Sequence, residues 1–196
     1  NPFYEDARDA IAPFTELVKS PEHLHTYKIS ALSLWNAAAS GHSPEQVMER
    51  LNQYSKFPVP ENVSKEILET MARYGLVRLV RHEGKFLLEG DDEGLMNEIW
   101  KSSAVNSFFA EDREEDGRIE VLKNFRGPLK MAMAKQRFPV EDLAGYITGA
   151  SLEVKLRDAM VCNGKPFAPR DYQNEAANVF YASGGIKGGS GVIVLP

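Results

Sequence analysis

Apolar residues recur at helical spacing through the first part of the chain, and most of these stretches have clear start and stop signals. The second of three short helices opens with a capping box at Ser43, and the first and third stop at Gly41 and Gly75. An earlier stretch, residues 5–19, has the same spacing, with Pro13 expected to kink it or to begin a second helix. The three predicted helices cover residues 30–40, 43–54 and 60–74.

Two short β-prone runs follow the third helix and flank Glu83 and Gly84, which is typical of a hairpin. The predicted strands cover residues 76–81 and 85–89. Three short helices followed by a hairpin is the order of a winged helix, in which the third helix can enter a DNA groove. We therefore expect a helical, winged-helix-like domain over residues 1–90.

The next segment changes to shorter elements. Asp92 can cap a helix, and an acidic turn closed by Gly117 separates two candidate strands. A basic helix and a stretch of alternating apolar and polar residues complete the segment. The predicted strands cover residues 104–110, 118–122 and 151–157, and the basic helix covers residues 126–137. We expect a small α+β domain over residues 91–160.

The last segment, residues 161–196, combines a polar linker, a short amphipathic helix opened by Pro169, a glycine-rich loop and an apolar run. The apolar run, residues 190–196, is typical of a strand buried on both faces of a parallel α/β sheet. Because such a strand needs neighbours, we expect it to begin a larger domain and the chain to be the front piece of a longer protein. The glycines precede the strand, whereas a phosphate-binding loop follows one, so we interpret them as a linker.

The charge balance excludes binding to nucleic acid through the overall field of the protein. The net charge is -5 at pH 7 and the pI is about 5.5, so any such contact has to come from local basic patches. One cysteine, Cys162, and four scattered histidines exclude a disulfide framework and argue against a metal site. From this cysteine usage we expect a cytoplasmic protein. No apolar run approaches membrane-spanning length, so we expect no membrane partner.

The winged-helix-like domain has two possible functions. If the domain binds DNA, the side chains that contact the phosphates are Lys65, Arg73, Arg78, Arg81 and Lys85. Against it, residues 26–90 contain eight basic and seven acidic side chains, and three of the glutamates lie on the predicted third helix. Because phosphates repel carboxylates, we favour a protein-docking domain over a sequence-reading one.

Specific segments carry a family resemblance. Residues 167–173 read Phe-Ala-Pro-Arg-Asp-Tyr-Gln and residues 190–196 read Ser-Gly-Val-Ile-Val-Leu-Pro. This pair resembles the opening of the helicase core, a RecA-like lobe, in XPB-type DNA repair helicases of superfamily 2. Residues 27–35 and 74–79 resemble the amino-terminal domain of that family, and residues 138–143 sit where its damage-recognition domain ends. The chain resembles the compact microbial members, because the long acidic insertion of the eukaryotic relatives is absent between Asp116 and Arg137.

The resemblance implies an ATP-hydrolysing translocase that opens duplex DNA with 3′ to 5′ polarity. In the Q motif of such motors a glutamine amide pairs with the adenine edge, and Gln173 matches that position. Phe167 and Arg170 match the positions that stack on and orient the base. Asp171 departs from the pattern, since relatives often have proline there.

The resemblance also places the phosphate loop, the Mg²⁺-binding acid and the arginine finger after Pro196. We therefore expect ATP and Mg²⁺ to be cofactors of the parent protein. We expect no cofactor to bind to this fragment, which should neither hydrolyse ATP nor unwind DNA.

Two hypotheses follow for the residues before the motor. In the first they form a regulatory, DNA-engaging region of a nucleoid-associated microbial helicase, with the second domain contacting distorted duplexes. The DNA contacts then involve Lys123, Arg126, Lys130 and Arg137 in addition to the hairpin residues. In the second, residues 1–90 are an interaction module that docks a repair nuclease or a complex subunit and binds no DNA.

Overall fold

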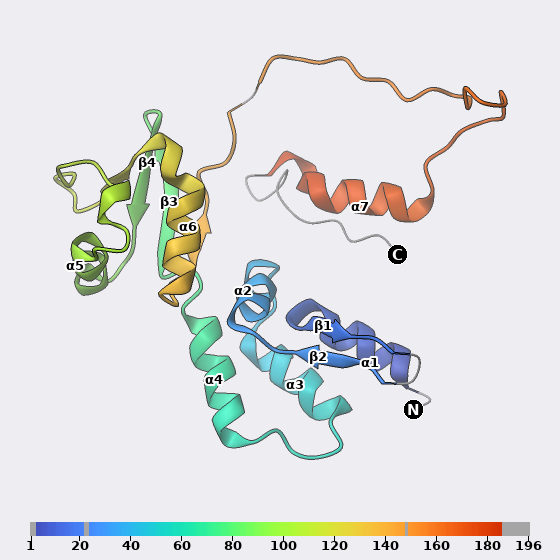
Figure 1. Cartoon of the computed structure of the whole chain (residues 1–196), viewed down its shortest axis with the longest axis horizontal. Coiled ribbons are helices and arrows are strands. Elements are labelled where there is room, and N and C mark those ends of the chain that lie inside the picture. Colours follow the sequence, from blue (N-terminus) through green and yellow to red (C-terminus); the bar gives the residue numbers. More distant parts are fainter. Residues whose placement is uncertain (1–2, 22–23, 148, 186–196) are drawn as a thin grey trace. The chain divides into compact units, whose positions relative to one another are not determined.

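A computed structural model of the chain describes residues 3–21, 24–147 and 149–185. It confirms the α+β class and divides the chain into two compact units, Asn1–Glu141 and Asp142–Pro196 (Figure 1). The expected domain boundary between residues 90 and 91 falls inside the first unit, so the three-domain division stays a prediction.

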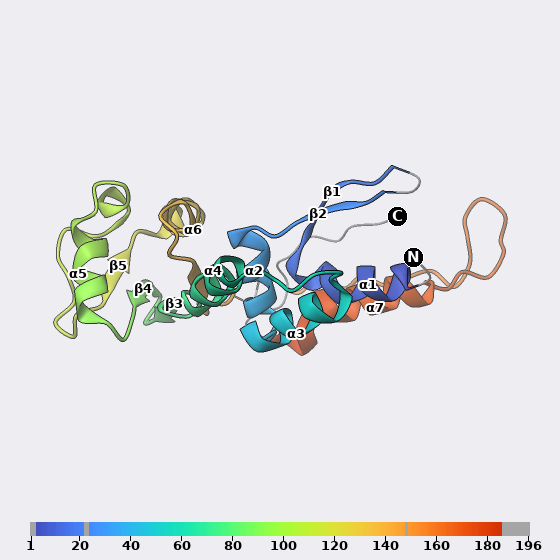
Figure 2. The ribbon, with the colours of Figure 1, turned by 90° about the horizontal axis from the view of Figure 1, so that it is seen from below.

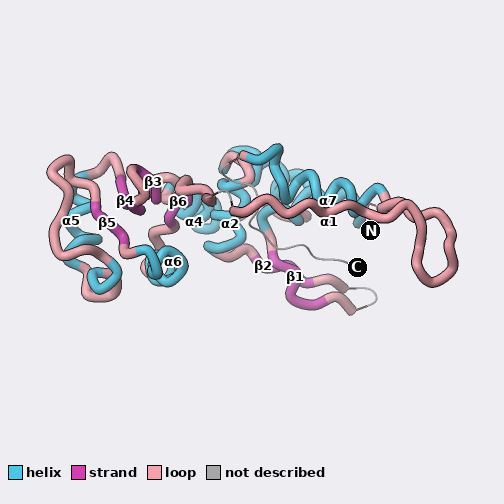
Figure 3. The backbone as a smooth tube through the Cα atoms, turned by 90° about the horizontal axis from the view of Figure 1, so that it is seen from above, coloured by secondary structure: helices cyan, strands magenta, loops and turns pink. Residues whose placement is uncertain are grey.

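The chain begins with a helix that is shorter than predicted. Helix α1 is Tyr4–Ile11, a 3₁₀ turn spans Ala12–Phe14, and strand β1, Glu16–Lys19, pairs antiparallel with β2, Thr26–Lys28. Pro13 ends the α-helix because its ring removes a backbone donor and crowds the preceding turn. The predicted continuation of this helix to residue 19 was therefore wrong. Figure 3 shows β1 and β2 as a separate two-stranded ribbon.

The three predicted helices are confirmed. They are α2, Ala31–Ala39, α3, Pro44–Tyr54, and α4, Glu61–Ala72. Capping boxes begin α2 and α3, where the hydroxyl groups of Ser30 and Ser43 accept hydrogen bonds from backbone N–H groups of the first turn. The helices bury a common core of Phe14, Leu34, Ala37, Val47, Ile67 and Met71.

The predicted hairpin is confirmed and lies in the middle of a larger sheet. Strands β3, Val77–His82, and β4, Lys85–Glu89, join β5, Ile119–Val121, and β6, Val140–Asp142, in the order β5-β4-β3-β6. Glu83 and Gly84 both have positive φ, 48° and 79°, as a two-residue hairpin turn that follows the strand twist requires. β5 pairs antiparallel with β4.

Two helices accompany the sheet. They are α5, Glu93–Lys101, capped by Asp92 as predicted, and α6, Arg126–Lys135, which a 3₁₀ turn at Lys123–Phe125 precedes. In Figure 1 strands β3 and β4 lie between α5 and α6, and Figure 2 shows the same part of the chain from below. Each helix buries an apolar pair, Met96 and Ile99 in α5 and Leu129 and Met133 in α6.

Two predicted strands are wrong. Within residues 104–110 the structure has a 3₁₀ turn, Asn106–Phe108, and only Phe109 forms an isolated bridge, to Val121. Residues 151–157 form no strand and leave Leu152 and Val154 exposed at 83% and 76%. Alternation alone does not make a strand, because a strand also needs a neighbour to hydrogen-bond with and a surface to pack on.

The second unit contains α7, Asp171–Tyr181, which confirms the helix predicted after Pro169, and a 3₁₀ turn at Ala182–Gly184. The predicted strand at residues 190–196 lies outside the described residues, as does most of the glycine-rich loop.

Adjacent residues of α4 test the helical core. Ile67 is 2% exposed and Leu68 is 43% exposed. We predict that Ile67→Ala lowers the free energy of unfolding by about 2–5 kcal/mol, because it removes buried methyl groups and leaves a cavity. Leu68→Ala, the matched control, should change it by no more than about 0.5 kcal/mol. Urea unfolding measures both, and equal effects would contradict the assignment of Ile67 to the core.

Candidate nucleic-acid interface

A half-buried aromatic ring on β4 brings two of the predicted DNA-binding residues together. Arg81 and Phe86 face each other across the hairpin, and the Arg81 guanidinium carbon lies 4.9 Å from the Phe86 ring centroid. The Arg126 guanidinium carbon lies 5.3 Å from the same centroid. Cations at these distances are attracted by the electron-rich face of the ring. We name Arg81, Phe86 and Arg126 the Phe86 patch.

The route of the chain explains why Arg126 reaches this ring. Val121, the last residue of β5, lies opposite Phe86, and only the short 3₁₀ turn separates it from α6. Lys123 lies exposed within that turn, and Lys130 lies one helical turn after Arg126 on α6. Because β5 pairs with β4, the start of α6 lies close to the hairpin.

Arg78 is on the same strand but is held by carboxylates. Its guanidinium contacts Asp91 through two nitrogens, at 2.7 and 3.2 Å, and its Nε lies 3.4 Å from Glu89. The hydrogen bonds from Arg78 lower the pKa of the Asp91 carboxyl. Arg78 and Arg81 are three residues apart on β3, so their side chains leave opposite faces of the strand.

Lys85 is also paired with carboxylates. Its Nζ lies 2.7 Å from Glu120 Oε2 on β5 and 3.0 Å from Glu114 Oε1 in the preceding loop. Hydrogen bonds to Glu120 and then to Glu114 raise the pKa of Lys85 to about 12. In contrast, no carboxylate among the described residues pairs with Arg81.

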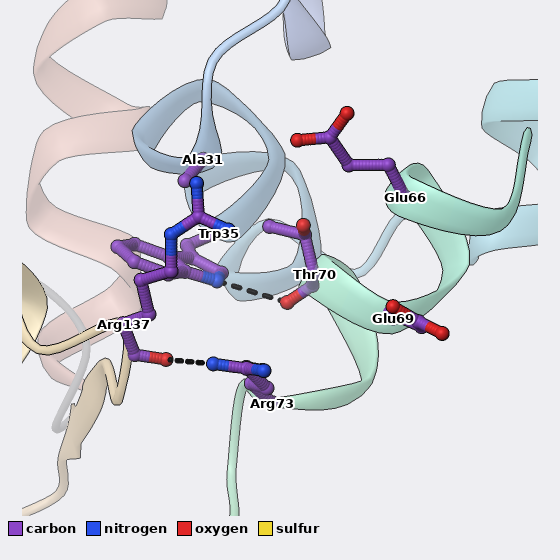
Figure 4. A pocket seen from close by; sticks show the side chains of 7 residues that line it. All are labelled: Ala31, Trp35, Glu66, Glu69, Thr70, Arg73 and Arg137. Carbon is purple, nitrogen blue, oxygen red and sulfur yellow. Dashed lines mark hydrogen bonds between the residues drawn. The ribbon is translucent and has the colours of Figure 1, made fainter. Parts of the chain in front are cut away.

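Arg137 lies at the other end of α6, about 16 Å along the helix axis from Arg126. It adopts the left-handed conformation, with φ of 64°, just past the helix end, where Phe138 N donates to Met133 O. Its carbonyl accepts a hydrogen bond from Arg73 Nη1 at 3.3 Å (Figure 4). Its side chain lines a hollow of about 40 Å³ together with Trp35 and residues of α4, so it does not join the Phe86 patch.

The three predicted adenine-contacting residues lie in the second unit. Phe167 and Arg170 are exposed, and Phe167 N donates to Asp158 O at 2.9 Å. The amide oxygen of Gln173 accepts a hydrogen bond from Arg170 N at 2.9 Å and thereby caps the start of α7. This bond uses one of the two lone pairs of that oxygen and leaves the amide NH₂ group as a donor.

Sequence reasoning missed Phe86. A signal was present, because a two-residue turn at Glu83 and Gly84 pairs residue 81 with residue 86 across the hairpin. Nothing local predicts that Arg126 reaches the same ring.

Over the described residues, no group of three or more histidine, cysteine or acidic side chains is arranged to hold a metal ion. In the same part of the chain, no helix combines the length and the apolar character that crossing a membrane requires.

Comparisons with known proteins place the chain in a family. The family described as "Helicase conserved C-terminal domain" matches residues 1–114, more than half of the chain. The chain belongs to this helicase family, and its predicted resemblance to XPB-type helicases of superfamily 2 is confirmed by the relatives that follow.

Three relatives are all named as XPB helicases. The protein named DNA 3'-5' helicase XPB of Mycobacterium tuberculosis is 40% identical over 97% of this chain, and that of Kineococcus radiotolerans is 40% identical over 96%. The general transcription and DNA repair factor IIH helicase/translocase subunit XPB of Enterocytozoon bieneusi is 28% identical over 98% of the chain. The chain spans about one third of the length of these relatives: 33%, 32% and 31%.

The Lys85 pairs give a pH-dependent signature. We predict that NMR titration of the Lys85 side chain finds a pKa of about 12, above the ordinary lysine value of about 10.4. Because folding raises this pKa, the stabilisation from the pairs is fully present below about pH 10.4 and is lost as the pH rises through the folded-state value. Glu120→Gln should lower the Lys85 pKa, whereas Glu115→Gln in the same loop should leave it unchanged. A titration insensitive to Glu120→Gln would contradict the pairing.

Proposed function

We propose that this chain is the DNA-engaging, regulatory region of an ATP-dependent 3′ to 5′ helicase of the XPB type that acts in DNA repair. The names of its relatives support the helicase activity and its polarity. The observation that carries the DNA contact is the Phe86 patch, where Arg81 has no carboxylate partner among the described residues and a second guanidinium lies over the same ring.

The chemistry of the patch suits a phosphate backbone. A guanidinium presents several N–H donors in a plane, and it binds phosphate oxygens in a bidentate manner. Two positive groups held beside one ring concentrate positive potential at one place on an otherwise acidic protein. Lys123 and Lys130 flank Arg126 in sequence and extend the proposed contact along the start of α6. Contacts of Arg137, Arg78 and Lys85 with DNA remain predictions.

The finer architecture is part of the proposal. The order α2, α3, α4, β3, β4 supports a winged-helix-like region, and the sheet with α5 and α6 supports a damage-recognition-like region next to it. The segment from Phe167 onward is proposed to begin a RecA-like motor lobe. We expect the parent protein to be associated with the nucleoid of a microbial cell.

Adenine recognition by Gln173, with Phe167 and Arg170 beside it, is also proposed. The adenine edge needs one donor and one acceptor, and the Gln173 amide supplies both, since its oxygen keeps a second lone pair. If the parent protein binds ATP, transfer of the γ-phosphoryl group to water, with release of ADP, would supply the free energy for translocation. We assign no Mg²⁺ ligand to the described residues.

The Phe86 patch makes a testable contribution to DNA binding. We predict that Arg81→Ala and Arg126→Ala each weaken binding to a short duplex several-fold and reduce the salt dependence of the affinity by about one phosphate contact. Fluorescence anisotropy over a series of salt concentrations measures both quantities. The matched control is Arg157→Ala, which removes the same charge from the second unit. Unchanged affinity in Arg81→Ala and Arg126→Ala would contradict the proposal.

The alternative, a module that docks a repair nuclease or a complex subunit without binding DNA, is supported by a separate observation. The β1–β2 ribbon exposes Leu17 and Val18, and Leu24 between its strands is 70% exposed. Exposed apolar side chains that gather on one element are typical of protein interaction sites. In addition, the Enterocytozoon bieneusi relative is named as a subunit of a larger factor.

The ribbon is tested in the whole chain, because a fragment ending at residue 90 would separate β4 from its partner β5. We predict that replacing Leu17 and Val18 by serine abolishes binding of a separately purified repair nuclease, measured by calorimetry. The affinity of the same variant for duplex DNA should stay unchanged. Serine at Leu152 and Val154 is the control for surface polarity. Retained nuclease binding by the ribbon variant would contradict docking through this element.

A further inference from the structure

The acidic loop before β5 is held in one shape by hydrogen bonds of its own. Gly117 N donates to Glu114 O at 2.9 Å, and Glu114 N donates to Arg118 O at 3.0 Å. Arg113 also reaches out of the loop and donates from Nη1 to Asn97 Oδ1 on α5. The position of Glu114 is thus fixed by the loop and by a neighbouring helix.

This loop delivers Glu114 to the same ammonium group that Glu120 holds from β5. Lys85 Nζ lies 3.0 Å from one carboxylate and 2.7 Å from the other. Two negative charges therefore surround one positive charge. The ammonium group keeps a third N–H donor, and 49% of the side chain is accessible to solvent. The two carboxylates nevertheless neutralise its charge and repel a phosphate, so a full ion pair with DNA requires that they be displaced.

We propose that Glu114 and Glu120 form a carboxylate clamp that withholds Lys85 from nucleic acid and limits the affinity of the neighbouring Phe86 patch. The proposal rests on the DNA contact proposed above. Lys85 directly precedes Phe86, so their Cα atoms are about 3.8 Å apart while their side chains leave opposite faces of β4 next to the hairpin turn. Release of Lys85 would therefore add a phosphate contact beside the Phe86 patch, at the same end of the hairpin.

A limited affinity suits a protein that moves along DNA. Phosphate contacts are independent of sequence, and each one slows dissociation from every site. When carboxylates pair with the lysine, its phosphate contact is weakened although the lysine itself is still present.

The experiment compares duplex binding by the whole chain and by charge-matched variants. E114Q/E120Q should bind about three- to tenfold more tightly than the wild type at about 50 mM salt, and its salt dependence should steepen by about 0.9, the value for one phosphate contact. The control E111Q/E115Q removes two charges from exposed positions of the same loop region and should gain less. Equal gains in the two variants would overturn the clamp, because they would show only an effect of net charge.

A third variant traces the gain to Lys85. E114Q/E120Q/K85A should return to the affinity and salt dependence of the wild type. A triple variant that keeps the gain would overturn the proposal. Absence of DNA binding by all of these proteins would instead contradict the proposed DNA contact, and with it the role of the clamp in limiting affinity.

The clamp is also tested without DNA, by amine acetylation followed with mass spectrometry. Only the deprotonated amine reacts, so Lys85 should react more than tenfold more slowly than the exposed Lys123 in the wild type and approach it in E114Q/E120Q. Equal rates in the wild type would overturn the clamp, whatever the result with DNA.

Discussion

The register of the β3–β4 hairpin is the constraint on which the candidate interface depends. The turn at Glu83 and Gly84 fixes it, because both residues adopt positive φ and leave only two residues between the strands. A slip of one residue would send every side chain of β4 to the other face of the sheet. Phe86 would then lose its contact with Arg81, and Lys85 would lose its ion pairs with Glu120 of β5 and with Glu114 of the preceding loop.

The same register sorts the basic residues of the hairpin into two electrostatic groups. Arg78 and Lys85 meet acidic partners and are locally neutralised. Arg81 meets an aromatic ring, which attracts a cation without carrying a compensating charge. A near-neutral local charge count therefore conceals one position where positive potential is left unbalanced, and counting charges along the sequence underestimates it.

Features encoded by neighbouring residues could be predicted from the sequence. The capping box at Ser43 and the turn at Glu83 and Gly84 were predicted because they depend on residues close together in the sequence. Contacts between residues far apart in the sequence could not be predicted in this way. Glu114 is 29 residues from Lys85, and only the arrival of β5 beside β4 brings them together. Residues 151–157 show the converse case, in which a strand-like pattern has no strand beside it.

The central position of the hairpin in the sheet has a consequence for how this unit acquires its structure. β3 and β4 pair across two residues, so their hydrogen bonds form early and locally, on the microsecond scale of isolated hairpins. The partner on the β5 side lies some thirty residues further along, and its pairing carries the larger loop-closure entropy. The isolated hairpin therefore has an unpaired edge on each side, and backbone pairing with β5 closes the edge of β4 and makes β5 the outer strand on that side.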